Sequence, residues 1–175
     1  AFGVVADKEC NVWMGKWKGV FIFKNKTLQF LNGTDGPVAA ICTSNEGVYF
    51  AGPKGIWLYN GKEVERENYA VARSVRKIIS DNSNGIWLAS DVGLYHCNAG
   101  GKKHFMDTSL LLSAYVKGLA IGLGDTLWAG GLGGVNIIDK DKRERVIKPK
   151  EGRQSLYLNC LNKDDNGTSV IGTTE

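Results

Sequence analysis

Short apolar runs alternate with turns rich in glycine and asparagine along the whole chain, and one kind of run recurs. The runs are rich in β-branched and aromatic residues, which is typical of β-strands and not of helices. In each recurring run, a small residue stands two positions after an aromatic residue, and a glycine stands six positions after the same aromatic residue. The aromatic residues are Trp13, Tyr49, Trp87 and Trp128, and the glycines are Gly19, Gly55, Gly93 and Gly134.

The recurring run has the period of a propeller blade. Its marker positions, 13, 49, 87, 128 and 170, are separated by 36, 38, 41 and 42 residues. An apolar run precedes each marker, and a glycine-led run and then a more polar, alternating run follow it. Four strands in about forty residues, repeated along a chain, are typical of β-propellers. The sequence therefore predicts an all-β fold, a β-propeller-type array of four-stranded antiparallel blades with four complete blades plus half of a fifth.

The predicted blades occupy 1–35, 36–73, 74–114 and 115–154, and a partial blade occupies 155–175. First strands are expected at 2–6, 38–42, 75–79, 116–121 and 156–161, and outer strands at 28–31, 63–67, 102–106 and 144–147. The glycine after each second strand fits a tight turn or a close approach between sheets. The stretch 109–118 fits a helical turn and a loop equally well.

Charge and cysteine spacing leave this prediction unchanged and exclude several classes of function. The formal net charge is +4, and the densest basic stretch, 140–145, is interrupted by Asp141 and Glu144, so we expect no nucleic-acid partner. No apolar run reaches the roughly eighteen residues of a membrane helix, and the N-terminus does not resemble a signal peptide. The cysteines lie far apart, which argues against a zinc site and favours free thiols; they are Cys10, Cys42, Cys97 and Cys160.

The units resemble the two-component regulator propeller repeat. The third unit matches its pattern best, with Ile-Ile-Ser-Asp at 78–81, Asn-Gly-Ile-Trp-Leu-Ala-Ser at 84–90 and Gly-Leu-Tyr at 93–95. Three positions depart from the pattern. They are Tyr49 in place of tryptophan, Asn136 in place of tyrosine, and Val170 at an aromatic position.

This resemblance implies a function in signalling. Such repeats form the periplasmic or extracellular sensors of hybrid two-component histidine kinases of Bacteroidetes, which detect products of carbohydrate breakdown. The family's sensors carry many more repeats than this chain, so we expect a fragment that forms an open arc. We expect its end faces to be covered by another copy of the chain, as a homo-oligomer, or by further propeller blades of the full-length receptor.

Residues for catalysis or metal binding are scarce. The only histidines, His96 and His104, fall on predicted strands, and no Gly-x-Ser-x-Gly motif is present. The stretch 81–85, Asp-Asn-Ser-Asn-Gly, resembles a calcium loop, but Val92 stands where an EF-hand needs its glutamate, so a turn is expected. We therefore predict no enzyme activity, no catalytic residues, no metal and no cofactor.

The turns between second and third strands, and the loops between blades, share one face of a propeller, where ligands commonly bind. Trp17 stands out because no other unit has an aromatic residue at that place. An exposed tryptophan between lysines suits a sugar ring carrying carboxylates or sulfates; the alternative is that Trp17 packs against a neighbouring blade or copy. The candidate ligand-binding residues are Trp17, Lys16, Lys18, Lys54, Tyr69, Arg73 and Asp91.

Two other classes of protein fit the repeats less well than a sensor that binds an oligosaccharide or another small ligand. A propeller enzyme similar to the streptogramin lyases needs a metal-supported general base, which two histidines hardly supply. A protein-interaction scaffold of the WD-repeat kind should carry Gly-His and Trp-Asp pairs, and the sequence has neither.

Overall fold

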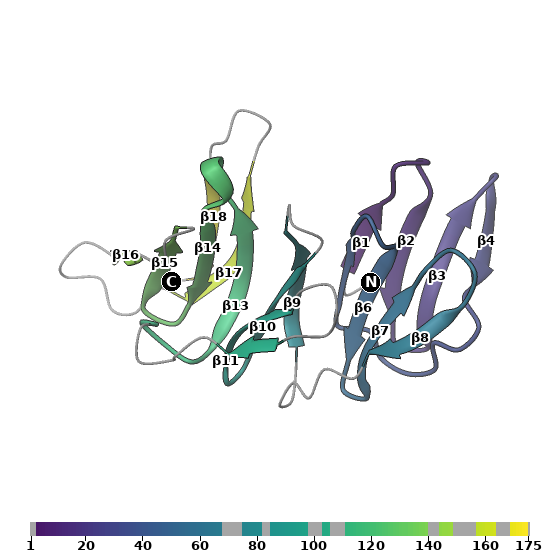
Figure 1. Cartoon of the computed structure of the whole chain (residues 1–175), viewed down its shortest axis with the longest axis horizontal. Helices are drawn as coiled ribbons and strands as arrows, with labels where there is room; N and C mark the ends of the chain where they lie inside the picture. The colour runs from purple at the N-terminus through teal and green to yellow at the C-terminus, as the bar shows by residue number, and fades with distance from the viewer. Residues whose placement is uncertain are drawn as a thin grey trace.

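The computed structural model of the chain describes residues 3–67, 75–81, 85–97, 103–105, 111–139, 144–148, 157–163 and 169–174. Within these ranges the strands form four four-stranded antiparallel sheets and one two-stranded sheet, each built from consecutive strands (Figure 1). The all-β array of four complete blades plus half of a fifth is thereby confirmed. No helix in the described part of the chain is long and apolar enough to cross a membrane.

Each blade is a simple meander, because every strand pairs with the next one along the chain. Blade 1 comprises β1 (Gly3–Ala6), β2 (Val12–Lys16), β3 (Gly19–Lys24) and β4 (Thr27–Phe30). Blade 2 comprises β5 (Ala40–Thr43), β6 (Val48–Gly52), β7 (Gly55–Tyr59) and β8 (Val64–Glu67). Blade 3 comprises β9 (Val75–Ser80), β10 (Ile86–Ser90), β11 (Gly93–Cys97) and β12 (Lys103–Phe105).

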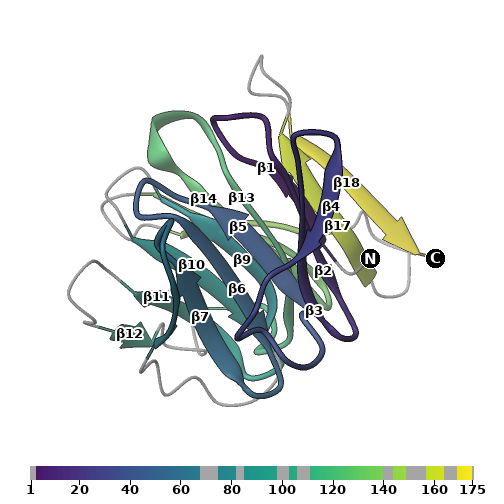
Figure 2. The ribbon, with the colours of Figure 1, turned by 90° about the vertical axis from the view of Figure 1, so that its right-hand side faces the viewer.

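Blade 4 comprises β13 (Val116–Ile121), β14 (Leu127–Gly131), β15 (Gly134–Ile138) and β16 (Glu144–Ile147), with the short 3-10 turn η2 (Leu123–Asp125) between its first two strands. The half blade comprises β17 (Tyr157–Lys163) and β18 (Ser169–Thr174). The first strands of successive blades are neighbours, and β5, β9 and β13 lie side by side in Figure 2. Residues 111–115 form a loop with bends before β13, and residues 116–118 belong to β13 itself.

The hydrophobic core lies between blades and not within any one of them. Between blades 1 and 2, Trp13 of β2 packs with Phe50 of β6, and these side chains are 3% and 1% exposed. Between blades 2 and 3, Tyr49 of β6 packs with Leu88 of β10, and Ala89 of β10 belongs to the next core, between blades 3 and 4. Alternate residues of one strand therefore serve two different cores, as the two-residue period of a strand requires.

The glycine of the repeat has the same conformation in all four blades. Gly19, Gly55, Gly93 and Gly134 have φ between 133° and 142°, a region that side chains with a Cβ rarely adopt. At Gly19 a Cβ would also lie 2.1 Å from the carbonyl oxygen of Thr34. At Gly55 the nearest atom, at 3.2 Å, belongs to the flexible side chain of Arg66. The glycine six positions after each aromatic residue is thus required by its positive φ and, at Gly19, also by the close approach of the Thr34 carbonyl oxygen.

We predict that Gly19→Ala lowers the free energy of unfolding by about 3 kcal/mol and Gly55→Ala by about 1 to 2 kcal/mol. Both substitutions strain the same φ, but only the first drives a methyl group into a backbone carbonyl. Urea unfolding followed by circular dichroism measures the difference. Equal losses at the two positions would show that conformational strain alone fixes the repeat glycine.

The three cysteines whose side chains are described are free thiols, as the sequence predicts. Cys42 and Cys97 are buried in the core between blades 2 and 3, whereas Cys10 is exposed in the turn after β1. Burial raises the pKa of the Cys42 thiol to about 12, despite the opposing charge of Lys77. Because the thiolate is the nucleophile, Cys42 should be inert in the folded protein.

We predict that Cys10 reacts with N-ethylmaleimide in the native protein, while Cys42 and Cys97 react only after unfolding in urea. Mass spectrometry of tryptic peptides reads out each site separately. Native-state labelling of Cys42 at a rate similar to that of Cys10 would contradict the core described between blades 2 and 3.

Candidate functional site

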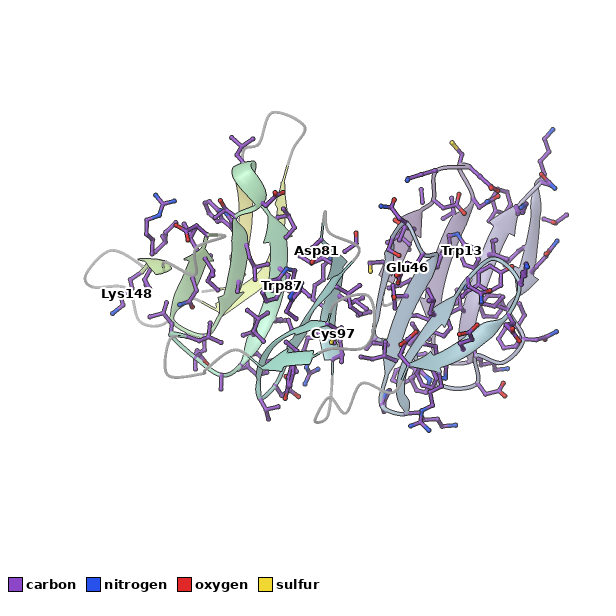
Figure 3. All side chains as sticks on the ribbon, in the orientation of Figure 1. Trp13, Glu46, Asp81, Trp87, Cys97 and Lys148 are labelled. Carbon is purple, nitrogen blue, oxygen red and sulfur yellow. The ribbon has the colours of Figure 1, made fainter. Side chains whose placement is uncertain are left out.

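A groove of about 840 Å³ opens between blades 1 and 2, at the end of the blades where first strands lead into second strands. Figure 3 shows Trp13 and Glu46 on these two blades, and Asp81 at a similar height on blade 3. Aromatic, amide and carboxylate side chains share the lining. The residues used below are Asp7, Lys8, Glu9, Asn11, Trp13, Lys24, Gln29, Asn45, Glu46, Tyr59, Asn60 and Asp81.

Asp7 organises the blade 1 side of the groove. One carboxylate oxygen accepts hydrogen bonds from the backbone N–H groups of Glu9 and Asn11, each at 2.9 Å. The other accepts from the Asn11 side-chain amide at 2.9 Å and from the indole Nε1 of Trp13 at 2.8 Å. Asp7 thereby caps the turn between β1 and β2 and fixes the orientation of the indole.

These contacts also set the charge state of Asp7. Desolvation alone would raise the pKa of its carboxyl group, but the hydrogen bonds from Trp13, Asn11 and Glu9 together outweigh it and lower the pKa below the ordinary value of 3.8. Because all of these partners donate to the charged form, Asp7 is an anion at neutral pH.

Two aromatic rings from different blades form the floor of the groove. The ring of Trp13 lies 5.3 Å from that of Tyr59 at the end of β7, tilted by 47°. The Tyr59 hydroxyl donates to the carbonyl oxygen of Gly61 at 3.0 Å, which fixes the orientation of the ring. Trp13 is almost fully buried and Tyr59 is half-buried, so Tyr59 presents the more accessible surface.

The rim of the groove carries more negative than positive charge. Its carboxylates come from Asp7, Glu9, Glu46 and Asp81, and its ammonium groups come from Lys8 and Lys24. Both lysines have partners on the rim: the Lys8 ammonium lies 2.8 Å from Asn45 Oδ1, and Lys24 lies 3.4 Å from Glu9. The Glu46 carboxylate accepts a short hydrogen bond from the hydroxyl of Tyr49. A chain with a net charge of +4 thus has a locally acidic groove.

Asp81 also belongs to a cluster on blade 3. One of its carboxylate oxygens accepts from the backbone N–H of Gly85 at 2.7 Å, and the other is hydrogen-bonded to Nε2 of His96. The His96 ring stacks on the indole of Trp87, with ring centres 4.2 Å apart. His96 therefore has a packing role in its strand. Among the described residues, no group of three or more His, Cys, Asp or Glu side chains is placed to hold a metal ion.

Five of the seven residues that the sequence singled out are described, and these five lie at the opposite end of the blades. Lys16, Trp17 and Lys18 form the turn between β2 and β3, where Trp17 is 70% exposed and the Lys16 ammonium lies 5.2 Å from the centre of the Phe21 ring. Lys54, in the turn between β6 and β7, lines a depression of about 10 Å³, which is the size of one water molecule.

Asp91, in the turn between β10 and β11, is held by an ion pair. Its two carboxylate oxygens lie 2.6 and 2.8 Å from two nitrogens of the Arg76 guanidinium, and this contact raises the pKa of Arg76. The same guanidinium lies 5.9 Å from the ring centre of Tyr115, just before β13. Asp91 therefore has a role in joining blades 3 and 4. Tyr69 and Arg73 lie outside the described residues.

Sequence reasoning missed the groove because its residues come from turns that looked like ordinary caps. One signal was available in the fixed distance of six positions from Asp7 to Trp13 and from Asp81 to Trp87. In blade 1 this spacing brings carboxylate and indole together, and in blade 3 the same aspartate position pairs with a histidine instead.

We predict that Asp7→Asn destabilises the protein by about 1 to 2 kcal/mol at pH 7, because the neutral amide is a weaker acceptor for the indole and backbone donors. The folded pKa of Asp7 is lowered, so its contribution is complete above the unfolded value near 3.8 and disappears as pH falls through the folded value. Urea unfolding measures the difference in unfolding free energy between wild type and variant. This difference should be present at pH 7 and should disappear in strong acid. The exposed Asp35→Asn is the matched control; a gap that does not change with pH would rule out the charged cap.

The four meandering sheets, with their cores between sheets, define the chain as a β-propeller array. Neither a family model nor a curated protein matches the sequence. Solved structures similar to this chain include two from B. thetaiotaomicron. The extracellular domain of the proposed one-component system BT4673 has a TM-score of 0.84 at 21% identity, over 98% of this chain and 25% of that chain. The extracellular domain of the proposed hybrid two-component system BT3049 has a TM-score of 0.79 at 24% identity, over 97% of this chain and 25% of that chain.

An enzyme has a similar fold. Virginiamycin B lyase from Staphylococcus aureus superposes with a TM-score of 0.77 at 12% identity, over 96% of this chain and 61% of that chain. At such identities the likenesses show the fold, and at that level they confirm the propeller resemblance carried by the repeats. Because propellers serve sensors and enzymes alike, the absence of enzyme activity stays a prediction.

Proposed function

We propose that this chain is part of the ligand-sensing domain of an extracellular or periplasmic receptor of the hybrid two-component kind, and that it is not an enzyme. The fold neighbours support this proposal, since two are described as extracellular domains of bacterial one-component and hybrid two-component systems. The chain spans 25% of the length of each. Signalling to a histidine kinase would therefore depend on parts of a receptor beyond these blades.

The groove between blades 1 and 2 is the proposed binding site, and its lining carries the proposal. Its volume of about 840 Å³ falls in the range of small-molecule sites. Half-buried Tyr59 offers an aromatic surface to a sugar ring. The amide groups of Gln29, Asn45 and Asn60 line the groove, and each already bonds to a neighbouring group of the protein. A primary amide has two donor hydrogens and two acceptor lone pairs, so each can also meet a sugar hydroxyl group. This combination of one apolar surface and several neutral polar groups suits a carbohydrate-derived ligand.

The charges of the rim narrow the ligand class. Carboxylates accept hydrogen bonds from sugar hydroxyls and attract ammonium groups, but they repel uronates and sulfates. Both lysines of the rim already have partners, in Asn45 and Glu9. We therefore expect neutral oligosaccharides or amino sugars in the groove, and weaker binding of acidic ones.

The turn with Trp17 is a second candidate site with the opposite preference. Trp17 is 70% exposed between Lys16 and Lys18, which favours a sugar carrying carboxylates or sulfates. Because the groove and this turn lie at opposite ends of the blades, one panel of ligands and two variants separate them.

We predict that neutral or amino oligosaccharides bind to the wild type and that Glu9→Lys weakens this binding at least about tenfold, or 1.4 kcal/mol. Glu9 is an exposed rim residue, so reversing its charge alters the groove without opening the core. Isothermal titration calorimetry gives the affinities, and Trp17→Ala is the matched control that leaves them unchanged.

Two outcomes would contradict the groove. Preferential binding of uronic or sulfated oligosaccharides that is lost in Trp17→Ala would assign the ligand to the turn. Binding of neutral sugars that is equally strong in Glu9→Lys and in wild type would place them elsewhere. Mass spectrometry of the recovered oligosaccharide tests the enzyme alternative, since a sensor returns its ligand unchanged.

A further inference from the structure

Each of the four turns between second and third strands carries one apolar residue at its tip. These residues are Trp17, Pro53, Val92 and Leu132, in blades 1 to 4. The turns lie at the end of the blades opposite the candidate groove and opposite η2, which stands at the top of blade 4 in Figure 1. We call this end the turn face. It includes Ile147, because β16 ends beside the start of β15.

The apolar residues of the turn face are open to water. Trp17 is 70%, Ile147 43%, Val92 42% and Leu132 38% exposed. Blades 3 and 4 each pack between two other sheets, so the exposure of Val92 and Leu132 is not that of an end face. Single exposed apolar residues are common on proteins. Here, however, such a residue recurs at the same turn of successive blades, and this regularity indicates a surface for binding.

Basic side chains surround the apolar tips. Lys16 and Lys18 flank Trp17, Lys54 follows Pro53, and a nitrogen of the Arg66 guanidinium donates to the carbonyl oxygen of Lys54 at 2.9 Å. Among the described residues of these turns and the strand ends beside them, the basic ones are Lys16, Lys18, Lys54, Arg66, Arg76, Lys117 and Lys148, and the acidic ones are Asp35, Glu67 and Asp91. Arg76 and Asp91 pair with each other, so the remaining excess is basic.

The two ends of the blades therefore differ in charge. On the rim of the groove, carboxylates outnumber ammonium groups, whereas basic residues outnumber acidic ones among the described residues of the turn face. A protein with this asymmetry turns its basic end toward an anionic surface. The partner of the turn face should therefore be negatively charged, and the groove should point away from it.

The spacing and composition of the turn face favour a lipid surface over a folded protein. Its apolar tips belong to different sheets, which pack about 10 Å apart, so the tips do not merge into one apolar patch. Protein interfaces have a contiguous apolar core and are depleted in lysine. The headgroup region of a bilayer, by contrast, accepts separate tryptophan and aliphatic side chains, and anionic lipids attract lysines.

We propose that the turn face binds the surface of a membrane that contains anionic lipids. The apolar tips would enter the headgroup region, and the lysines would lie against lipid phosphates. Binding of this kind is peripheral and reversible, because each blade inserts only the tip of one turn. The candidate groove would face away from the membrane and stay open to its ligand. Membrane binding and ligand binding are thus separate properties, and each can be lost without the other.

Flotation of the 175-residue chain with lipid vesicles at low salt tests the proposal. The wild type is expected to float with vesicles of equal parts phosphatidylglycerol and phosphatidylcholine, and to bind at least about tenfold less well to phosphatidylcholine alone. Added salt should weaken the binding. The double variant Lys18→Glu with Lys54→Glu should lose at least about tenfold in affinity for the anionic vesicles.

The matched control for charge is Lys26→Glu with Lys62→Glu. It makes the same change of net charge at two exposed positions in the turns after β3 and β7, at the groove end, and should bind close to wild type. For the apolar tips, Val92→Ser with Leu132→Ser should weaken binding several-fold. Leu123→Ser in η2, at a position that is 71% exposed, should not.

Tryptophan fluorescence gives a second readout. Trp17 is the most exposed of the described tryptophans, so anionic vesicles should shift the emission to shorter wavelength, and Trp17→Phe should remove this shift. Circular dichroism establishes that the variants are folded, which their exposed positions favour.

Three results would overturn the proposal. The first is a wild type that does not float with the anionic vesicles at low salt. The second is an equal loss of binding in the Lys18 and Lys54 variant and in the Lys26 and Lys62 control, which would reduce the effect to net charge. The third is binding that needs the lysines but not Val92 and Leu132, which would indicate a soluble anionic ligand, such as a sulfated sugar, in place of a lipid surface.

Discussion

The packing of one sheet face against the next is the constraint on which the rest of this structure depends. A four-stranded meander has two faces, and here both are apolar, so an isolated blade has no side that favours water. Trp13 of blade 1 and Phe50 of blade 2 lie in one buried core, which shows how neighbouring blades cover each other's apolar faces. The φ of glycines such as Gly19 is a separate constraint within each blade, because Gly19 begins the third strand and lies against the carbonyl oxygen of Thr34, which follows the fourth strand of the same blade.

The fold was predictable from the sequence because this constraint repeats. In each blade the aromatic residue packs in a core and the glycine six positions later adopts the positive φ of the turn. Both are therefore kept in every unit, and the repeat is visible although the residues between them vary. Departures are also informative. Asn136 of β15 stands where a tyrosine is usual, and its buried carbonyl oxygen accepts a hydrogen bond from the backbone N–H of Leu112 at 3.2 Å. A polar residue thus replaces a ring where a bend of the preceding loop passes beneath it.

The candidate site was less predictable, for a physical reason. Turn residues such as Asp7 and Asn11 satisfy their own backbone in any β-hairpin, so their presence does not reveal a groove. Only the three-dimensional structure shows that the indole of Trp13 completes the Asp7 cap and that Tyr59 of another blade closes the floor. Conversely, Asp91 looked available in the sequence, and the guanidinium of Arg76, on a neighbouring strand of the same blade, occupies it. In both cases, the role of a side chain depends on a partner from another element of the structure.

The uniform glycine geometry has an evolutionary consequence. A segment of 36 to 42 residues that carries its own turn, its own aromatic residue and a matching face on either side can be duplicated in tandem without redesigning its neighbours. The ends of the blades are free of that requirement. At the residue whose N–H closes the turn after the first strand, which is Asp7 in blade 1, blades 2, 3 and 4 have Ser44, Asp81 and Gly122. Such arrays can therefore gain blades by duplication of whole units, while the turn at the end of each hairpin changes independently. New binding sites can then arise without a change of fold.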